Sequence, residues 1–349
     1  MPPLTYRQPD LVLRRQGGPA SDRQIRDLQR DLRQLGYLKR GIDGRFGSGT
    51  ERAVKALQHD LLRNNGTGRD GNAAVSIKDL NAQRVTAITG EADQALVECI
   101  SDLLDDPRVG KLPAAANPRQ ENQRVLDALA AMSSDSVPIP FLLAILTQES
   151  GLKHFNEPKP GDEDTFITIG LDAVPTDSEV ITSRGYGAGQ FTLFHHPPRP
   201  EEVTDVMTDV QKNVGRAIGE LREKFNRFVN GPADRAQDRI VEAGAGPLRE
   251  CRFAPGTPER FTDCATCLRN AGTVSIVENE TAVHAGSTVL FHSTSFYDMR
   301  TSRAFYTDVP RRAGFECDWP YAARRYNGGG INSYHYQVRI LKHLAGGTG

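Results

Sequence analysis

Glu149 stands at the end of a predicted helix whose other inward positions are apolar. Pro138 and Pro140 are typical of the first turn of a helix, and the following apolar residues share the face of Glu149 at helical spacing: Leu142, Ile145 and Leu146. Burial and the negative end of the helix dipole are both expected to raise the pKa of the Glu149 carboxyl. Cleavage of a glycosidic bond needs such an acid to protonate the leaving oxygen. The alternative is an exposed glutamate at a frayed helix end.

Two later motifs add polar side chains of the kind that line a sugar-binding cleft. Glu149-Ser150 is followed by SRGYGAGQFT at 183–192 and then by AARRYNGGG at 322–330. This ordered set resembles the lysozyme-like domain of lytic transglycosylases and goose-type lysozymes, with GAGQ in place of a GLMQ-like segment. The resemblance implies that Glu149 is the catalytic acid and base. It also implies four substrate-binding residues: Ser150, Gln190, Tyr326 and Asn327. The alternative for Asn327 is a structural role at the start of the last helix.

The acidic segment after Glu149 offers a second carboxylate. The sequence ESGLKHFNEPKPGDEDTFITIGL at 149–171 is similar to the Glu–Asp–Thr region of phage-type lysozymes, where an Asp begins a hairpin and a Thr follows. This resemblance implies catalytic roles for Asp162 and Thr168, with Asp164 as the rival carboxylate because the gap after Glu149 is longer here. In hydrolysis, a second carboxylate activates water or stabilises positive charge on the sugar. The alternative is an acidic, solvent-exposed loop.

The N-terminal region predicts two short helices around a glycine-rich turn. Ser21 or Asp22 can cap the first helix, Gly36 ends it, and Thr50 can cap the second. The apolar positions recur at helical spacing in both: Ile25, Leu28, Leu32, Leu35, Ala53, Val54, Leu57 and Leu61.

The pattern LQRDLRQLGYLKRGIDGRFGSGTERAVKALQ in this region resembles the peptidoglycan-binding module of bacterial cell-wall hydrolases. The resemblance implies that a groove beside the loop at 43–47 binds the wall peptide or sugar, with Asp43 and Phe46 as contact residues. The alternative is that this loop only builds the turn, because its glycines reach positive φ cheaply.

Four of the five cysteines are predicted to be linked. Cys251, Cys264 and Cys267 cluster and Cys317 follows, a spacing that fits two disulfides, a four-thiolate zinc site or unpaired thiols. We favour disulfides because the target compartment is oxidising. No metal ion or other cofactor is assigned to the catalytic reaction, and Cys99 is predicted to be a buried free thiol.

Composition breaks divide the chain into three parts. We predict a peptidoglycan-binding domain at 1–85, a helical connector and linker at 86–120, and a lysozyme-like catalytic domain at 121–349. Residues 200–315 depart from the lysozyme-like pattern, although the alternation at 273–297 predicts a small β insertion within about 245–300. The expected fold class is mainly α, with a small helical wall-binding domain and an α+β lysozyme-like domain. Because Glu149 lies outside the first domain, that domain is predicted to be a separable tether.

The charge balance argues against nucleic acid as a partner. The net charge of the 349 residues is −1, yet residues 11–63 hold 12 Lys/Arg against 6 Asp/Glu, and residues 156–180 hold 7 Asp/Glu against one Lys. Such bias is typical of solvated faces or of ligand contact. No run approaches the roughly 20 apolar residues of a membrane span, and the N-terminus lacks the apolar segment of an ordinary secretory signal.

These features predict a muramidase that hydrolyses the MurNAc-β-1,4-GlcNAc bond of peptidoglycan glycan strands. The alternatives are a lytic transglycosylase that yields anhydro-muropeptides, or a non-catalytic wall-binding component of a phage or secretion system. The protein is expected to be made in the cytoplasm and to act in the periplasm or on the wall, with no membrane partner. An endolysin or an antibacterial effector would act in this way, with delivery machinery or an immunity protein as further partners.

Overall fold

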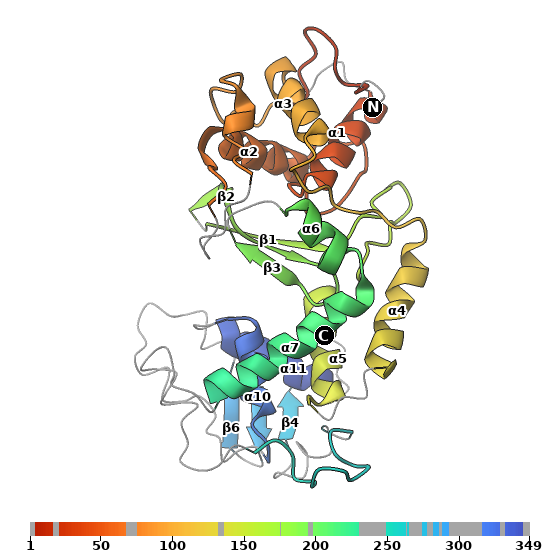
Figure 1. The fold of residues 1–349 in the computed structure, drawn as a ribbon. Coiled ribbons are helices and arrows are strands. Elements are labelled where there is room, and N and C mark those ends of the chain that lie inside the picture. The colour runs from red at the N-terminus through yellow and green to blue at the C-terminus, as the bar shows by residue number, and fades with distance from the viewer. Residues whose placement is uncertain are drawn as a thin grey trace. The chain divides into compact units, whose positions relative to one another are not determined.

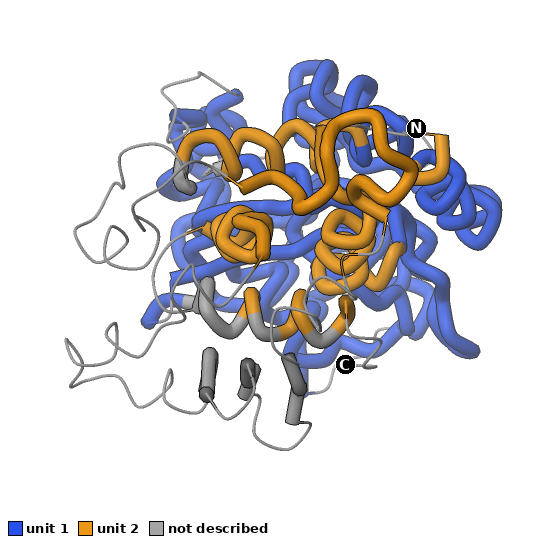
Figure 2. The backbone as a smooth tube through the Cα atoms, turned by 90° about the horizontal axis from the view of Figure 1, so that it is seen from below, with its two compact units in different colours: residues 1–128, 153–214 blue, residues 129–152, 215–349 orange. Residues whose placement is uncertain are grey.

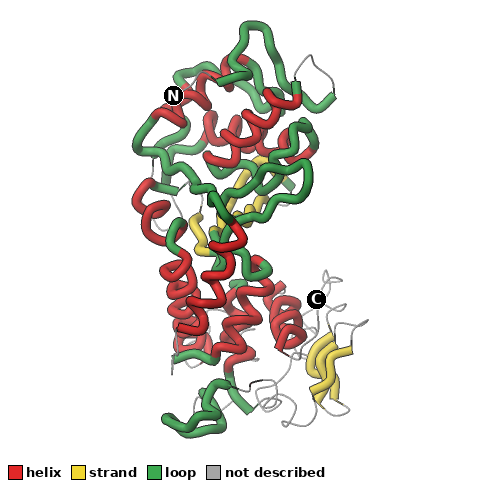
Figure 3. The backbone as a smooth tube through the Cα atoms, turned by 90° about the vertical axis from the view of Figure 1, so that its right-hand side faces the viewer, coloured by secondary structure: helices red, strands yellow, loops and turns green. Residues whose placement is uncertain are grey.

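The computed structural model forms two compact units (Figure 2): residues 1–128 with 153–214, and residues 129–152 with 215–349. These units differ from the predicted boundaries at 85 and 120, because residues 153–214 join the N-terminal part of the chain. The structure describes residues 4–16, 21–67, 75–131, 136–174, 176–194, 198–229, 249–262, 264, 274–277, 282–285, 288–292, 316–328 and 332–344. Helices predominate among the described residues, as predicted (Figure 3).

The first unit combines helices with one antiparallel sheet (Figure 1). Its first helices are α1 (Asp22–Gln34), α2 (Ser48–Arg63), the 3₁₀ turn η1 (Asp79–Asn81), α3 (Gln94–Asp105) and most of α4 (Pro118–Ala131). The sheet has the order β1 (Ile169–Val174), β2 (Asp177–Tyr186) and β3 (Phe191–Phe194). The short α6 (Pro200–Glu202) and the π-helix η2 (Val203–Met207) follow, and α7 (Val210–Lys224) begins in this unit.

The second unit is built mainly from helices near Glu149. It contains α5 (Ile139–Ser150), the end of α7, the π-helix η3 (Phe225–Val229), α10 (Trp319–Tyr326) and α11 (Asn332–Leu344). It also contains the antiparallel sheet of β4 (Val274–Val277), β5 (Ala282–Ala285) and β6 (Thr288–His292), as the alternation at 273–297 predicts. Trp319 stacks on Phe225 with ring centroids 4.0 Å apart, which joins α10 to η3.

The predicted helix pair at 21–63 is confirmed, with one correction. Ser21 caps α1 in a capping box with Gln24, and Gly36 follows the helix with a φ of 79°. Thr50 does not cap α2, because the helix already begins at Ser48 after an N-cap glycine without a side-chain bond. Thr50 is instead buried, and its hydroxyl accepts a hydrogen bond from Gln29 Nε2 at 3.0 Å.

Two buried ion pairs join the N-terminal helices to the later half of the first unit. Arg33 Nε of α1 lies 3.0 Å from Asp164 Oδ2, and Arg184 Nη2 of β2 lies 3.1 Å from Asp60 Oδ2 of α2. Arg33 Nη2 also donates to the carbonyl of Ile167 at 2.7 Å. Removing one charge of such a pair leaves the other buried and unpaired, which costs far more than losing a surface contact.

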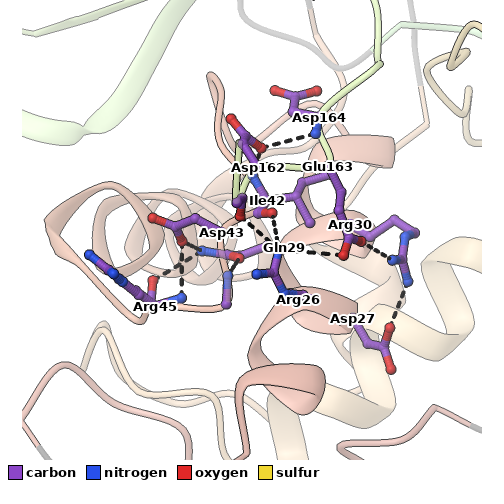
Figure 4. A network of polar contacts seen from close by, with 12 residues as sticks. Arg26, Asp27, Gln29, Arg30, Ile42, Asp43, Arg45, Asp162, Glu163 and Asp164 are labelled. Atoms are coloured by element: carbon purple, nitrogen blue, oxygen red, sulfur yellow. Dashed lines mark hydrogen bonds and ion pairs between the residues drawn. The ribbon is translucent and has the colours of Figure 1, made fainter. Parts of the chain in front are cut away.

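The acidic segment at 162–164 contacts the basic face of α1 and the adjoining turn (Figure 4). Glu163 pairs with Arg26 and Arg30, while Asp162 Oδ1 accepts the Ile42 N–H at 2.7 Å. The opposite charge excesses of the two sequence regions therefore meet inside one folding unit. This contact contradicts the interpretation of the N-terminal module as a separable tether.

The segment predicted as a linker after α3 is a packed, extended part of the first unit. Val109 and Leu112 are buried, and the Leu112 N–H donates to the Gln34 carbonyl at 2.7 Å. Ile167 N–H donates to the Pro113 carbonyl at 3.0 Å, so the segment also contacts the chain between the acidic residues 162–164 and β1. In the described ranges, no helix is both long and apolar enough to cross a bilayer.

We predict that Arg33→Met destabilises the protein by about 3–5 kcal/mol, because Asp164 would then be buried without its counter-charge. Arg30→Met is the matched control on the same helix, since its partners Asp27 and Glu163 are solvated and such pairs contribute about 0–1 kcal/mol. Urea unfolding of the full chain measures both free energies. Adding Asp164→Asn to Arg33→Met should recover part of the loss, because the unpaired charge is removed while the amide oxygen still accepts one of the two backbone N–H groups, those of Gly41 and Phe166. An equal cost for Arg33→Met and Arg30→Met would contradict the role given to the buried pair.

Candidate functional site

The end of α5 presents Glu149 as the helix pattern predicts. Pro138 is the N-cap, Pro140 lies in the first turn, and the helix ends at Gly151 in the left-handed conformation. The apolar residues on the face of Glu149 are fully buried, namely Leu142, Ile145 and Leu146, while Glu149 itself is half-buried. The carboxylate therefore stands where an apolar helix face reaches solvent.

Two tyrosines of the second unit, Tyr336 and Tyr326, interact with the charge of the Glu149 carboxylate. Tyr336 of α11 is buried, and its hydroxyl donates to Glu149 Oε1 at 2.6 Å. The pKa of Tyr336 is raised well above 10, first by burial and then by the Glu149 charge. Burial also raises the pKa of Tyr326, and the Glu149 charge adds to the effect. Both phenols thus remain protonated donors in the field of this carboxylate.

The GAGQ segment forms a rigid turn between β2 and β3 in the first unit. His154 lies beneath it, with Nδ1 accepting the Ala188 N–H at 3.3 Å and Nε2 donating to the Met207 carbonyl at 2.9 Å. Burial lowers the pKa of His154 to about 4, so the ring is neutral near pH 7. Asn213 Oδ1 accepts the Gly189 N–H at 2.8 Å. A side chain at Gly187, whose φ is 71°, would collide with the imidazole of His154.

Gln190 lies across two glycines of the sheet. Its backbone has a positive φ of 49°, and its Nε2 donates to the Gly187 carbonyl at 2.8 Å. Gly170 and Gly185 are cross-strand partners, and a Cβ on either one would lie 2.5 or 2.7 Å from Gln190 Oε1. The two glycines therefore create the space that the Gln190 amide fills.

The predicted second carboxylate is part of the contact with α1 and its turn. Asp162 Oδ1 accepts the N–H groups of Ile42 and Asp164, so this oxygen shapes the loop. Its rival Asp164 is 1% exposed and paired with Arg33, which gives it a structural role. Thr168 is half-buried, and its backbone joins His154 to Gly187 through two hydrogen bonds. The catalytic roles of Asp162 and Thr168 remain predictions.

The structure brings together only part of the predicted site within one unit. Glu149, Ser150, Tyr326 and Asn327 belong to the second unit, whereas Asp162, Thr168 and Gln190 belong to the first. Ser150 Oγ donates to the Leu146 carbonyl at 3.0 Å, as a helix-terminal serine commonly does. Asn327 is exposed and occupies the C-cap position of α10, whereas the structural alternative placed it at the start of the last helix, α11, which begins at Asn332.

The two predicted wall contacts at 43–47 both have structural roles. Asp43 Oδ1 accepts from Gln29 Nε2 and from the Arg45 N–H, both at 2.9 Å (Figure 4), which closes the turn. Phe46 is 8% exposed and packs in the core with the apolar faces of α1 and α2. Most of the Phe46 ring is therefore inaccessible to a ligand.

The cysteine predictions are answered for one thiol. Cys99 is free and fully buried, as predicted, and burial raises its pKa to about 11. Cys264 and Cys317 are buried and Cys251 is half-buried, but Cys267 lies outside the described residues. The linkage of these four cysteines thus remains a prediction. No cluster of three or more His, Cys, Asp or Glu side chains suited to a metal ion occurs in the described part of the chain.

Three residues that support the candidate site were not predicted from the sequence: Tyr336, His154 and Asn213. Tyr336 is absent from the predicted site residues, although its phenol contacts Glu149. A signal for it exists, since Tyr336, Ile340, Leu341 and Leu344 form the buried face of α11 and a buried tyrosine hydroxyl usually has a partner. His154 and Asn213 carry no comparable local signal, because their partners are backbone groups of a distant turn.

Residues 21–71 match the family model described as "Putative peptidoglycan binding domain". Comparison with curated proteins and with solved structures gave no match. The predicted module at the N-terminus is thereby supported, with peptidoglycan as its partner and the cell wall as the place of interaction.

We expect Gly185→Ala to displace the Gln190 amide while leaving the fold intact. The added methyl would meet Oε1 at the far end of a flexible side chain, so Gln190 can move and the stability cost should stay below about 1 kcal/mol. Gly219→Ala on α7 is the control, because its Cβ would contact nothing within 4 Å. Thermal unfolding and glycan-cleavage assays measure the two effects separately. Unchanged cleavage by Gly185→Ala would show that the position of Gln190 is irrelevant to the reaction.

Proposed function

We propose that the protein is a peptidoglycan muramidase in which Glu149 is the general acid for cleavage of the MurNAc-β-1,4-GlcNAc bond. The observation that carries the proposal is the 2.6 Å hydrogen bond from Tyr336 to Glu149 at the end of an apolar helix. A carboxyl held in one orientation, partly shielded from water, suits proton transfer to a leaving oxygen.

The wall-binding module supports the same proposal from the substrate side. The family match of this module indicates that the chain binds peptidoglycan. The lysozyme-like motifs supply the acid that cleavage of the glycan bonds in peptidoglycan requires. The GAGQ turn adds an amide fixed by the sheet, which suits recognition of sugar hydroxyl groups. The lysozyme-like assignment of the remaining chain rests on the resemblance of its motifs.

Glu149→Gln should abolish clearing of purified sacculi, with a rate loss of at least about 10²–10⁴-fold, because an amide cannot donate the required proton. The volume of the side chain is nearly unchanged and Tyr336 can still donate to the amide oxygen, so the fold should persist. Glu223→Gln is the matched control in the same unit, since Glu223 is solvated on α7. Turbidity and release of soluble glycan report the rate, and circular dichroism reports the fold. Clearing by Glu149→Gln at the rate of Glu223→Gln would exclude Glu149 as the acid.

A lytic transglycosylase is the second candidate, and the position of Asp162 favours it. Transglycosylation needs one acid, since a hydroxyl of the substrate attacks in place of water. Hydrolysis usually needs a second carboxylate, yet one oxygen of Asp162 already binds two backbone N–H groups. A structural Asp162 would leave Glu149 without that partner in the reaction.

Asp162→Asn separates the two reactions, because the amide Oδ1 can keep both backbone hydrogen bonds while the negative charge is lost. A muramidase that uses Asp162 should give products with reducing ends, and Asp162→Asn should slow it severely at unchanged melting temperature. Mass spectrometry of digested sacculi identifies the products. Anhydro-muropeptides from wild type, with an active Asp162→Asn variant, would replace the muramidase with the transglycosylase.

A further inference from the structure

An open groove in the first unit lies outside the loop that the family resemblance assigns to the wall. Its volume is about 380 Å³, and it is lined by Arg14, Arg15, Gln16, Glu51, Thr89, Gly90 and Glu91. Only Glu51 belongs to the segment that matches the peptidoglycan-binding family. From the charges and the construction of this groove, we infer that it binds a zwitterionic peptide, one that carries both carboxylate and ammonium groups.

The walls of the groove are fixed by the backbone and by a buried amide. Leu13 and Ala92 exchange two backbone hydrogen bonds of 3.0 and 2.9 Å, which places Arg14 beside Glu91. Gln58 is 2% exposed, and its Oε1 accepts the N–H groups of Thr89 and Gly90, both at 2.9 Å. The Gln58 Nε2 donates to Thr89 Oγ1 and to the Glu91 carbonyl, both at 3.0 Å. The loop that carries Thr89 and Glu91 is therefore preorganised.

The charges in the groove come in pairs of opposite sign. Arg14 lies 3.5 Å from Glu91, and Arg15 lies 3.3 Å from Glu51, which also contacts Lys55 at 3.3 Å. These side chains are between 26% and 56% exposed, so each pair is weak and exchanges partners at low cost. A ligand carboxylate can take a guanidinium through two parallel hydrogen bonds, while a ligand ammonium takes the glutamate that is released.

The same lining disfavours a sugar ring as the ligand. Sites for neutral ligands are lined mostly by apolar and aromatic side chains, and none of the described lining residues is aromatic. The lining contributes two guanidinium groups and two carboxylates, which favours a ligand that carries charges of both signs. In the cell wall, the cross-linking peptides carry carboxylate and ammonium groups, whereas the glycan backbone does not. The inference thus deepens the proposed function, on which it rests, by giving the first unit a peptide site.

The test is binding of the tripeptide alanyl-glutamyl-lysine to the full chain, followed by calorimetry or by amide chemical shifts. Replacing both arginines, Arg14→Gln with Arg15→Gln, should weaken binding about tenfold or more, since two charge-assisted contacts are lost. Arg23→Gln is the matched control, an exposed arginine on α1 outside the groove. The same peptide with its carboxylates amidated should bind weakly to the wild type. Equal affinity of the double variant and the control, or of the amidated peptide, would overturn the inference.

Sacculus pull-down separates this inference from the proposed function. Wild type should bind intact sacculi better than glycan from which an amidase has removed the peptides, and the double variant should lose that preference. Sacculus binding that is strong and insensitive to the double variant would reject the peptide site while leaving action on the wall in place. Absence of sacculus binding by wild type would reject wall binding itself. The double variant should keep the melting temperature of the wild type, so that a change in sacculus binding can be attributed to the groove and not to unfolding.

Discussion

The buried pairs Arg33–Asp164 and Arg184–Asp60 are the constraint on which the first unit depends. Each pair joins residues more than 120 positions apart, and no charged side chain in either pair is more than 7% exposed. Arg33 Nη1 and Arg184 Nη1 also have no hydrogen-bond partner among the described residues, so the burial of these charges is only partly compensated. Such pairs give little net stability compared with apolar packing, but they strongly disfavour any arrangement that leaves one charge alone. The two pairs therefore select one arrangement, in which the segment before β1 lies against α1 and strand β2 lies against α2.

The helices and the position of Glu149 could be predicted from local sequence patterns. The apolar face of α5, its prolines and Gly151 position Glu149 as expected, because these signals lie within 14 residues of one another. The same holds for α1, where Ser21 and Gly36 mark the two ends. Thr50 was misassigned because serine, threonine and glycine all occur near the start of α2, and the choice depends on the hydrogen bond from Gln29.

The long-range contacts could not be predicted from the sequence, although the charge bias of the regions that make them was visible there. The basic and acidic excesses were visible in the sequence, but nothing local shows that Arg33 meets Asp164 or that Arg30 meets Glu163. For the same reason the proline- and alanine-rich segment after α3 resembled a linker, whereas Leu112 is buried and bonded to Gln34. Tyr336 was missed because its partner Glu149 lies 187 residues earlier.

Under the proposed function, the packing of the wall-binding helices against the β1–β2 hairpin changes how wall binding can serve catalysis. A flexible tether raises the effective concentration of substrate but does not orient it. Here α2 packs on β2 and is paired through Asp60 to Arg184, which directly precedes Gly185 beneath Gln190. A wall strand held by the first unit would be fixed relative to the Gln190 amide by a rigid core. Under the proposed function, recognition of the wall and positioning of the glycan are then two properties of one folded body.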